Sequence, residues 1–167
     1  MIRWLLLVFG CMMPLQALAC SVTVDLYQAM QQRTVIRYEC ELDIQESIVL
    51  GYNQYNFGDS SVSIFTANWG ISYRRYIEKQ TAHGPFYSLG LRYGSLFMDD
   101  GTTEETDRLI MPYYDVGFKT KLSSEWSHVM AIEAGYVVAY SENVAIYDYI
   151  GLTLTLYYAF SYQLDAH

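Results

Sequence analysis

The sequence predicts an all-β protein, an eight-stranded antiparallel up-and-down transmembrane barrel. The first observation is the closing segment 150–162, where large apolar or aromatic side chains fall on every second residue. Successive side chains of a strand point to opposite faces, so this segment has one apolar face and one small, mostly polar face. It exceeds the roughly 9–11 residues that a tilted transmembrane strand needs. The same pattern recurs along the chain, and a secretion signal precedes it.

Residues 1–19 are predicted to be a secretory signal peptide. Met1–Arg3 is a short positive start, 4–15 is an apolar core, and Ala17–Ala19 is a small-x-small cleavage site. The apolar core is shorter than the about 20 residues of a membrane-spanning helix. We therefore expect an exported chain in which residues 20–162 form one barrel domain and 163–167 a short C-terminal tail.

Eight segments carry the alternation, and turn-forming or polar residues separate them. They run approximately over 21–29, 34–42, 47–56, 65–77, 86–97, 109–121, 128–140 and 149–162. An even number of strands brings both chain ends to one side of the membrane, as bacterial single-chain barrels require. The compact connections are predicted to be periplasmic, at 43–46, 78–85 and 122–127. The others are predicted to be extracellular, at 57–64, 98–108, 141–148 and a short turn near Met30.

In each segment the large apolar residues share one parity, and we expect this face to meet lipid. Before the closing segment they are, in order, Val22, Val24, Leu26; Ile36, Tyr38; Ile48, Leu50, Tyr52; Ala67, Trp69, Ile71, Tyr73; Tyr87, Leu89, Leu91, Tyr93, Phe97; Tyr114, Val116, Phe118; Met130, Ile132, Ala134, Tyr136 and Val138. The 17 tyrosines and the low charged fraction of 17% favour a lipid-facing surface.

The alternative is a soluble, periplasmic lipocalin-like binding barrel, with the apolar face inside. Its exterior would then be the other face, which carries glycine, serine, threonine and asparagine. Such an exterior lacks the charged residues that keep proteins soluble. A small barrel's narrow lumen, in contrast, suits small residues with a few charges. This comparison favours the membrane barrel.

Charged residues at inward positions are the candidate site. They form a predicted lumen ion network of Asp25, Arg37, Glu39, Arg74, Arg92, Asp115, Lys119 and Glu133. We expect Arg92 beside Asp115, Asp115 opposite Glu133, and Asp25 within diagonal reach of Arg37. Unpaired ions in a confined interior cost several kcal/mol each, so mixed-sign pairing is expected. The network is interpreted as a structural plug; the alternative is a gate in a narrow pore for ions or small solutes.

Two cysteines remain in the mature chain. Cys20 would be its first residue, and a hairpin reversing near Met30 would place Cys40 nearly opposite. Exported proteins meet an oxidising compartment, which favours a disulfide. The residues around the cleavage site also resemble those of a bacterial lipoprotein, in which Cys20 is lipidated. The sequence is compatible with a Cys20–Cys40 disulfide, with lipidation of Cys20 and with a free thiol.

Catalytic and cofactor chemistry is not predicted. The histidines are His83, His128 and His167, and none has the serine, cysteine or carboxylate pattern of a triad. The acidic segment 99–107 lacks the spacing of an EF-hand loop and is interpreted as a solvated turn. We expect no enzyme activity, no cofactor and no metal. The net charge of −8 argues against nucleic acid as a partner.

With this alternation, leader and strand order, the chain resembles the small eight-stranded bacterial outer-membrane proteins. These include the OmpA transmembrane domain, the OmpX group and the opacity-type proteins. The resemblance spans about 21–162 and rests on pattern, so it assigns no site residue. It implies a monomer in the outer membrane of a Gram-negative cell with a structural, envelope-integrity role. The implied partners are outer-membrane lipids, lipopolysaccharide and the barrel-assembly machinery. One departure is that residues 163–167 follow the closing aromatics Phe160 and Tyr162.

Overall fold

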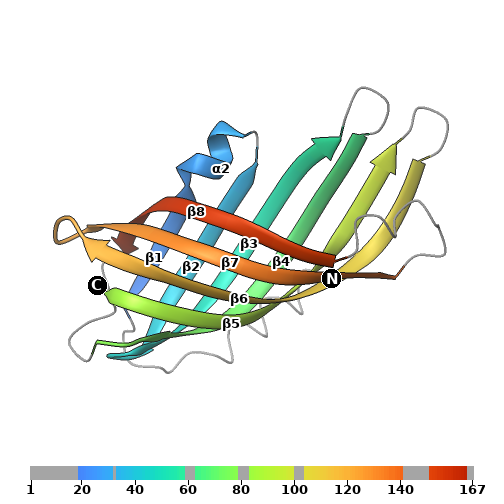
Figure 1. Cartoon of the computed structure of the whole chain (residues 1–167). Helices are drawn as coiled ribbons and strands as arrows, with labels where there is room; N and C mark the ends of the chain where they lie inside the picture. Colours follow the sequence, from blue (N-terminus) through green and yellow to red (C-terminus); the bar gives the residue numbers. More distant parts are fainter. Residues whose placement is uncertain are drawn as a thin grey trace, which may run out of the picture.

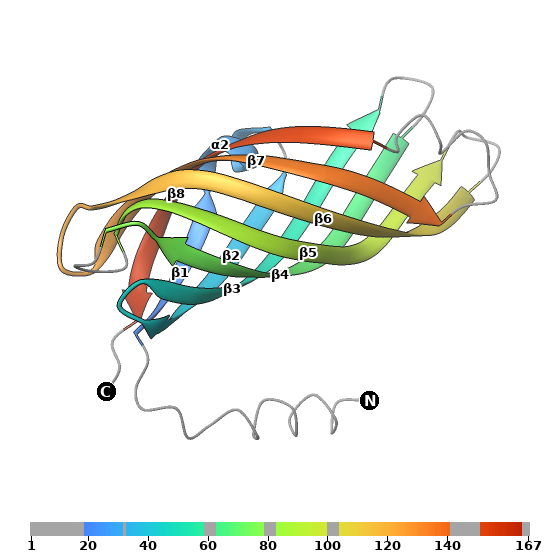
Figure 2. The same cartoon turned by 60° about the horizontal axis from the view of Figure 1, so that its bottom comes forward.

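The computed structural model is a closed barrel whose eight strands follow one another around the wall in chain order (Figures 1 and 2). The structure describes residues 19–31, 33–58, 63–78, 83–99, 104–140 and 151–164. Its strands are β1 (Cys20–Asp25), β2 (Thr34–Asp43), β3 (Glu46–Gly58), β4 (Ser63–Tyr76), β5 (Gly84–Asp99), β6 (Glu104–Lys121), β7 (Trp126–Tyr140) and β8 (Gly151–Leu164). Every neighbouring pair is antiparallel, including β1 with β8, so the predicted fold class is confirmed. Apart from Ala19, the predicted leader lies outside the described residues.

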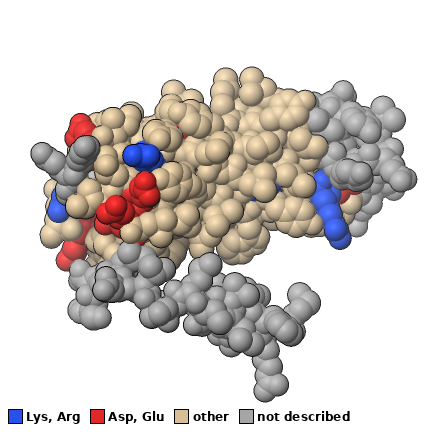
Figure 3. Space-filling model, turned by 90° about the horizontal axis from the view of Figure 1, so that it is seen from below, with Lys and Arg blue, Asp and Glu red and all other residues tan. Residues whose placement is uncertain are grey.

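The apolar face points outward. Leu152 and Leu154 are each 72% exposed, Trp69 is 69% exposed and Leu89 is 66% exposed. In Figure 3 the Lys, Arg, Asp and Glu side chains gather toward the two ends of the visible face, with a broad, mostly uncharged zone between them. A soluble lipocalin-like barrel would bury these residues, so that alternative is wrong. Within the described ranges, no helix is long and apolar enough to cross a membrane.

The first predicted strand, 21–29, ends early. β1 stops at Asp25 and a short helix follows, α2 (Leu26–Met30). Asp25 caps this helix, because its Oδ1 atom accepts a hydrogen bond from the backbone N–H of Gln28 at 3.0 Å. Aspartate side chains that bond to nearby backbone amides compete with the strand ladder in this way. The β1–β8 ladder therefore ends at the pair Asp25 and Ala159.

Other strands are longer than the alternation predicted. β5 reaches Asp99 and β6 begins at Glu104, inside the predicted loop 98–108. β8 starts at Gly151 and continues to Leu164, which pairs with Cys20, so the predicted tail begins within the barrel wall. The backbone ladder extends past the apolar zone, and apolar alternation could not reveal these polar ends.

Cys20 and Cys40 lie directly opposite each other on β1 and β2. The structure joins them by a disulfide, with their Cα atoms 4.2 Å apart. The bond ties the chain's first strand to its neighbour at the end of the barrel where β8 also finishes. Because lipidation would use the same Cys20 sulfur, a lipidated Cys20 could not hold this bond.

Candidate functional site: the charged lumen

The structure places all eight predicted lumen residues inside the barrel. Each is between 1% and 8% exposed. Four are basic, Arg37, Arg74, Arg92 and Lys119, and four are acidic, Asp25, Glu39, Asp115 and Glu133. They project from β1, β2, β4, β5, β6 and β7, because all occupy inward positions of the two-residue repeat. Their formal charges therefore balance within the lumen.

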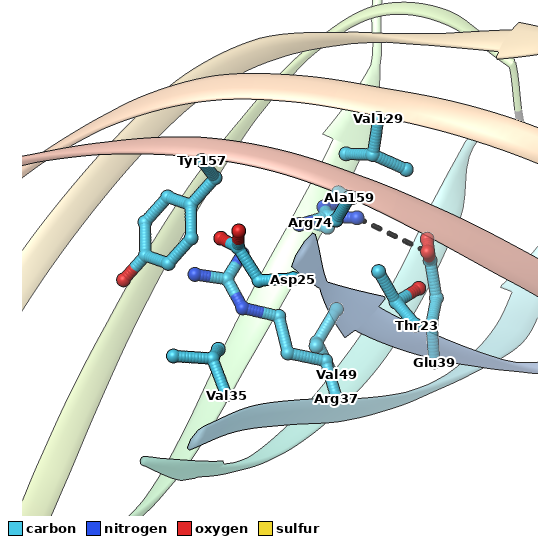
Figure 4. Close-up of a pocket in the computed structure, with 10 residues that line it drawn as sticks. All are labelled: Thr23, Asp25, Val35, Arg37, Glu39, Val49, Arg74, Val129, Tyr157 and Ala159. Carbon is cyan, nitrogen blue, oxygen red and sulfur yellow. Dashed lines mark hydrogen bonds and ion pairs between the residues drawn. The ribbon is translucent and has the colours of Figure 1, made fainter. Parts of the chain in front are cut away.

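Glu39 is the centre of the first ion cluster. Its Oε2 atom lies 3.0 Å from Arg74 Nη1 and 3.1 Å from Lys119 Nζ. Its Oε1 atom accepts a hydrogen bond from the Tyr76 hydroxyl at 2.7 Å. Figure 4 shows the Arg74–Glu39 ion pair as a dashed line. Both carboxylate oxygens are thus bonded, as a buried ion requires.

Glu133 is the centre of the second cluster. The Arg92 guanidinium meets it with two parallel bonds, Nη1 to Oε1 and Nη2 to Oε2. The Tyr157 hydroxyl donates to Oε2 at 2.9 Å, and Arg37 Nη2 lies 3.4 Å from the same atom. A bidentate arginine–carboxylate pair of this kind is stronger than a single contact and fixes the geometry of both groups.

Asp115 connects the two clusters. Its Oδ2 atom lies 3.5 Å from Arg37 Nη1 and 3.8 Å from Arg74 Nη2, while Oδ1 has no hydrogen-bond partner within the described residues. The result is one chain of alternating charge, which runs Lys119, Glu39, Arg74, Asp115, Arg37, Glu133 and Arg92. Its longest contacts are those of Asp115. We call these residues the lumen charge chain.

Each arginine of this chain also lies over an aromatic ring. The guanidinium carbon of Arg37 is 3.9 Å from the ring centroid of Tyr157. The corresponding distances are 4.0 Å from Arg74 to Phe86 and 4.3 Å from Arg92 to Tyr113. Such cation–π contacts are attractive and gain strength when desolvated. The charge pattern of the sequence does not identify these rings as site residues, but large aromatic side chains at inward positions among small residues are a signal that could have done so.

Two glycines make room for these side chains. A Cβ atom on Gly70 would lie 2.9 Å from Arg92 Cγ, and one on Gly90 would lie 2.5 Å from the ring of Tyr113. Both glycines occupy inward positions, where the lumen is filled by long side chains from neighbouring strands. Gly70 and Gly90 therefore leave the space that the side chains of Arg92 and Tyr113 occupy.

Two of the predicted pairings differ from the structure. Asp115 does lie opposite Glu133, but Arg92 lies opposite Met111 and bonds to Glu133 on β7, past the intervening strand β6, not to Asp115. Asp25 caps α2, and no ion pair joins it to Arg37 among the described residues. Long arginine side chains reach past their nearest strand neighbours, so register alone did not identify their partners.

The lumen around this chain is closely filled. An interior cavity beside it measures about 10 Å³ and is bordered by Asp25, Val35, Arg37 and Tyr157, among others (Figure 4). This is about the space of one water molecule. Its lining combines charged and polar side chains with valine and alanine side chains.

Neither His83 nor His128 belongs to the lumen charge chain. His83 stands in the turn before β5, and its Nε2 atom is 3.0 Å from the hydroxyl of Ser127. Partial burial, and then the positive charges of Lys119 and Lys121, lower the pKa of His83. His128 packs against Tyr158 with ring centroids 4.5 Å apart. His167 lies outside the described residues, within which no three His, Cys, Asp or Glu side chains are grouped to hold a metal.

Comparison with known proteins supports the fold and assigns no site. Neither the protein-family models nor the curated protein sequences match this chain. Among solved structures, Neisserial surface protein A (NspA) is similar, with a TM-score of 0.57 and 10% sequence identity. The match covers 88% of this chain and 96% of NspA. At this identity the likeness shows the fold alone, and the chain has the fold of the small eight-stranded outer-membrane barrels.

Proposed function

We propose that this chain is a non-enzymatic outer-membrane barrel with a structural, envelope-integrity role, whose lumen is plugged by the lumen charge chain. The observation that carries the proposal is the alternation of charge from Lys119 to Arg92. Its members come from β2, β4, β5, β6 and β7, so the ion pairs tie together strands from across the barrel.

Energetics support a plug. Removing one partner from a buried ion pair costs about 3–5 kcal/mol, because a charge is left uncompensated. Here most members of the chain contact two opposite charges, so moving one side chain aside to open a path disturbs several contacts at once. A small cavity of about 10 Å³ supports the same conclusion, since it leaves room for about one water.

Three points support the proposed location. The outward face is apolar along the strands, the predicted leader would direct export, and the fold is that of outer-membrane barrels. An apolar band of this kind meets lipid in transmembrane barrels. The proposed partners are therefore outer-membrane lipids, lipopolysaccharide and the barrel-assembly machinery, and the proposed state is a monomer.

The proposal is tested by the stability of the folded barrel in detergent micelles. Unboiled samples are heated stepwise and followed by the mobility of the compact band on a denaturing gel. Glu133→Gln should lose the compact band at a clearly lower temperature than the unmodified protein, because Arg92 and Arg37 lose their shared anion. Glu125→Gln is the matched control, since Glu125 lies exposed in the turn before β7. Equal transition temperatures for both variants would overturn the plug.

A second candidate is a narrow pore, favoured by the long contacts of Asp115. Its Oδ2 atom lies 3.5 Å and 3.8 Å from its two arginines, so this carboxylate is the group most easily displaced. A pore predicts that radiolabelled small ions enter liposomes containing the protein, at a rate that Asp115→Asn changes. A plug predicts the same slow entry as in protein-free liposomes.

A further inference from the structure

The barrel wall is incomplete between β1 and β8. Their ladder covers only the pairs from Cys20 with Leu164 to Asp25 with Ala159. β8 begins eight residues before Ala159, at Gly151, and throughout residues 151–158 the structure gives it a strand partner only on its β7 side. The helix α2 packs at the position where β1 would continue (Figure 1).

The uncovered edge of β8 lies on the lipid-facing part of the barrel. The carbonyl of Leu156 points to this edge, because it accepts a hydrogen bond from Gln28 Nε2 at 2.9 Å. The two-residue repeat directs the backbone groups of Leu152 and Leu154 to the same edge. Both side chains are 72% exposed, among the most exposed of the apolar face. Open sheet edges are not tolerated against hydrocarbon, because each unpaired backbone group costs several kcal/mol.

Gln28 of α2 forms a hydrogen bond with this edge. Gln28 is 1% exposed; its side chain donates to the Leu156 carbonyl and accepts from Arg33 Nη1 at 3.4 Å. Its backbone N–H donates to Asp25 Oδ1, and its carbonyl accepts from the N–H groups of Gln31 and Arg33. The helix itself has five residues. Helices shorter than about 12–15 residues are marginal without such outside support.

The first three residues of α2 can extend the ladder. Continuing the register of β1 and β8 places Leu26 opposite Tyr158 and Gln28 opposite Leu156. It also places Leu26 opposite Thr34 on β2. The apolar alternation of Val22 and Val24 continues through Leu26, as a strand would require. Both conformations of this segment are thus compatible with the sequence, one favoured by the Asp25 cap and the other by the ladder.

We propose that Leu26–Met30 form a conformational switch in the barrel wall. In one state they are the helix α2, and residues 151–158 of β8 have no strand partner on the β1 side, beside the cavity bordered by Asp25, Val35 and Tyr157. In the other state Leu26–Gln28 extend β1 and the chain turns at residues 29–31, so the wall is continuous from β8 to β2 as far as the pair Gln28 and Leu156. The switch is independent of whether the lumen is a plug or a pore.

The test is nuclear magnetic resonance on the isotope-labelled mature chain in lipid nanodiscs. The Cα shifts of Leu26–Gln28 report helix or strand. Relaxation dispersion at Leu156 and Tyr158, which face Gln28 and Leu26 in the continued register, reports microsecond-to-millisecond exchange. Leu26→Pro should abolish the dispersion and leave helical shifts, because proline suits the first helical position but cannot donate to a ladder. Asp25 has φ −87° and ψ 107°, an extended conformation that is allowed before proline.

Gln28→Val should shift the population the other way. It removes the bond to the Leu156 carbonyl, and a β-branched side chain favours the strand. Gln31→Val, an exposed position that keeps the Gln28 side chain, is the control and should leave the shifts near those of the unmodified protein. Purely helical shifts with no dispersion in the unmodified chain and in Gln28→Val would overturn the proposal. A single extended state in the unmodified chain would overturn it equally. If Leu26→Pro does not fold, the Gln28→Val and Gln31→Val pair decides.

Discussion

Asp115 and Glu133 lie directly opposite each other on β6 and β7, and the Arg37 guanidinium contacts both carboxylates. Its Nη1 atom lies 3.5 Å from Asp115 Oδ2 and its Nη2 atom 3.4 Å from Glu133 Oε2. Two like charges at facing positions destabilise a sheet unless a counter-charge separates them. Arg37 comes from β2, across the lumen, so a distant strand supplies the charge that makes this pair tolerable.

Replacing Arg37 by alanine should therefore destabilise the barrel by about 3–5 kcal/mol, the cost of breaking a buried ion pair. The free energy of unfolding in urea, measured from detergent micelles, gives the value. Arg75→Ala is the matched control, because Arg75 is exposed at the end of β4, and such surface changes stay within about 0.5 kcal/mol. Equal unfolding midpoints for the two variants would contradict the role given to Arg37.

Gly90→Ala should also destabilise the protein, through overpacking. The new Cβ atom would stand 2.5 Å from the Tyr113 ring, which supports the Arg92 guanidinium. Such crowding costs about 1–3 kcal/mol. Gly51→Ala is the control, because its nearest neighbour would be 3.8 Å away, an ordinary contact. If both substitutions had the same small effect on unfolding, the lumen at Gly90 would be looser than described.

The disulfide predicts that neither Cys20 nor Cys40 carries a free thiol in the folded protein. Mature chain purified without reductant should not react with a maleimide at Cys20 or Cys40, whereas the reduced and unfolded chain should react at both. Loss of the cross-link through Cys40→Ser should lower the free energy of unfolding by about 3 kcal/mol. The control is the unmodified protein with reductant, which should unfold like the variant. A maleimide reaction at Cys40 alone would instead indicate that Cys20 carries a lipid.

The lowered pKa of His83 predicts one part of the pH dependence of the barrel's stability. Burial and the neighbouring lysines lower its pKa in the folded protein, so the folded state favours the neutral ring. The unfolded chain then binds more protons, and this contribution to stability is present above the ordinary pKa of about 6.5 and is lost as the pH falls. Unfolding midpoints measured from about pH 8 to about pH 5 should fall less steeply for His83→Gln than for the unmodified protein. Parallel curves would contradict this assignment.

Much of this fold could be predicted from the sequence because the two-residue repeat carries the information. Leu152 and Leu154 alternate with small residues, and that alternation fixes both the strand and its lipid-facing side. The same repeat placed the eight residues of the predicted ion network on the inward face, because every second side chain of a strand points inward, and the structure buries them.

The side-chain partners and the helix α2 depend on contacts that the two-residue repeat does not encode. Arg92 on β5 reaches Glu133 on β7, because an arginine is long enough to pass its neighbours on β6. The helix α2 replaces the end of the predicted first strand because the Asp25 side chain bonds locally to Gln28. Tyr157 lies on the otherwise small, mostly polar face of β8, and its role beneath Arg37 depends on three-dimensional packing.

The central claim is that the lumen charge chain closes the barrel. The most direct measurement is single-channel conductance of the folded mature chain in planar lipid bilayers, at low and high applied voltage. The account predicts no resolved conductance steps for the unmodified protein, because its bonded ions and tightly packed rings leave no continuous aqueous path. Stable, reproducible steps whose size changes with Asp115→Asn would contradict the plug and establish a narrow pore.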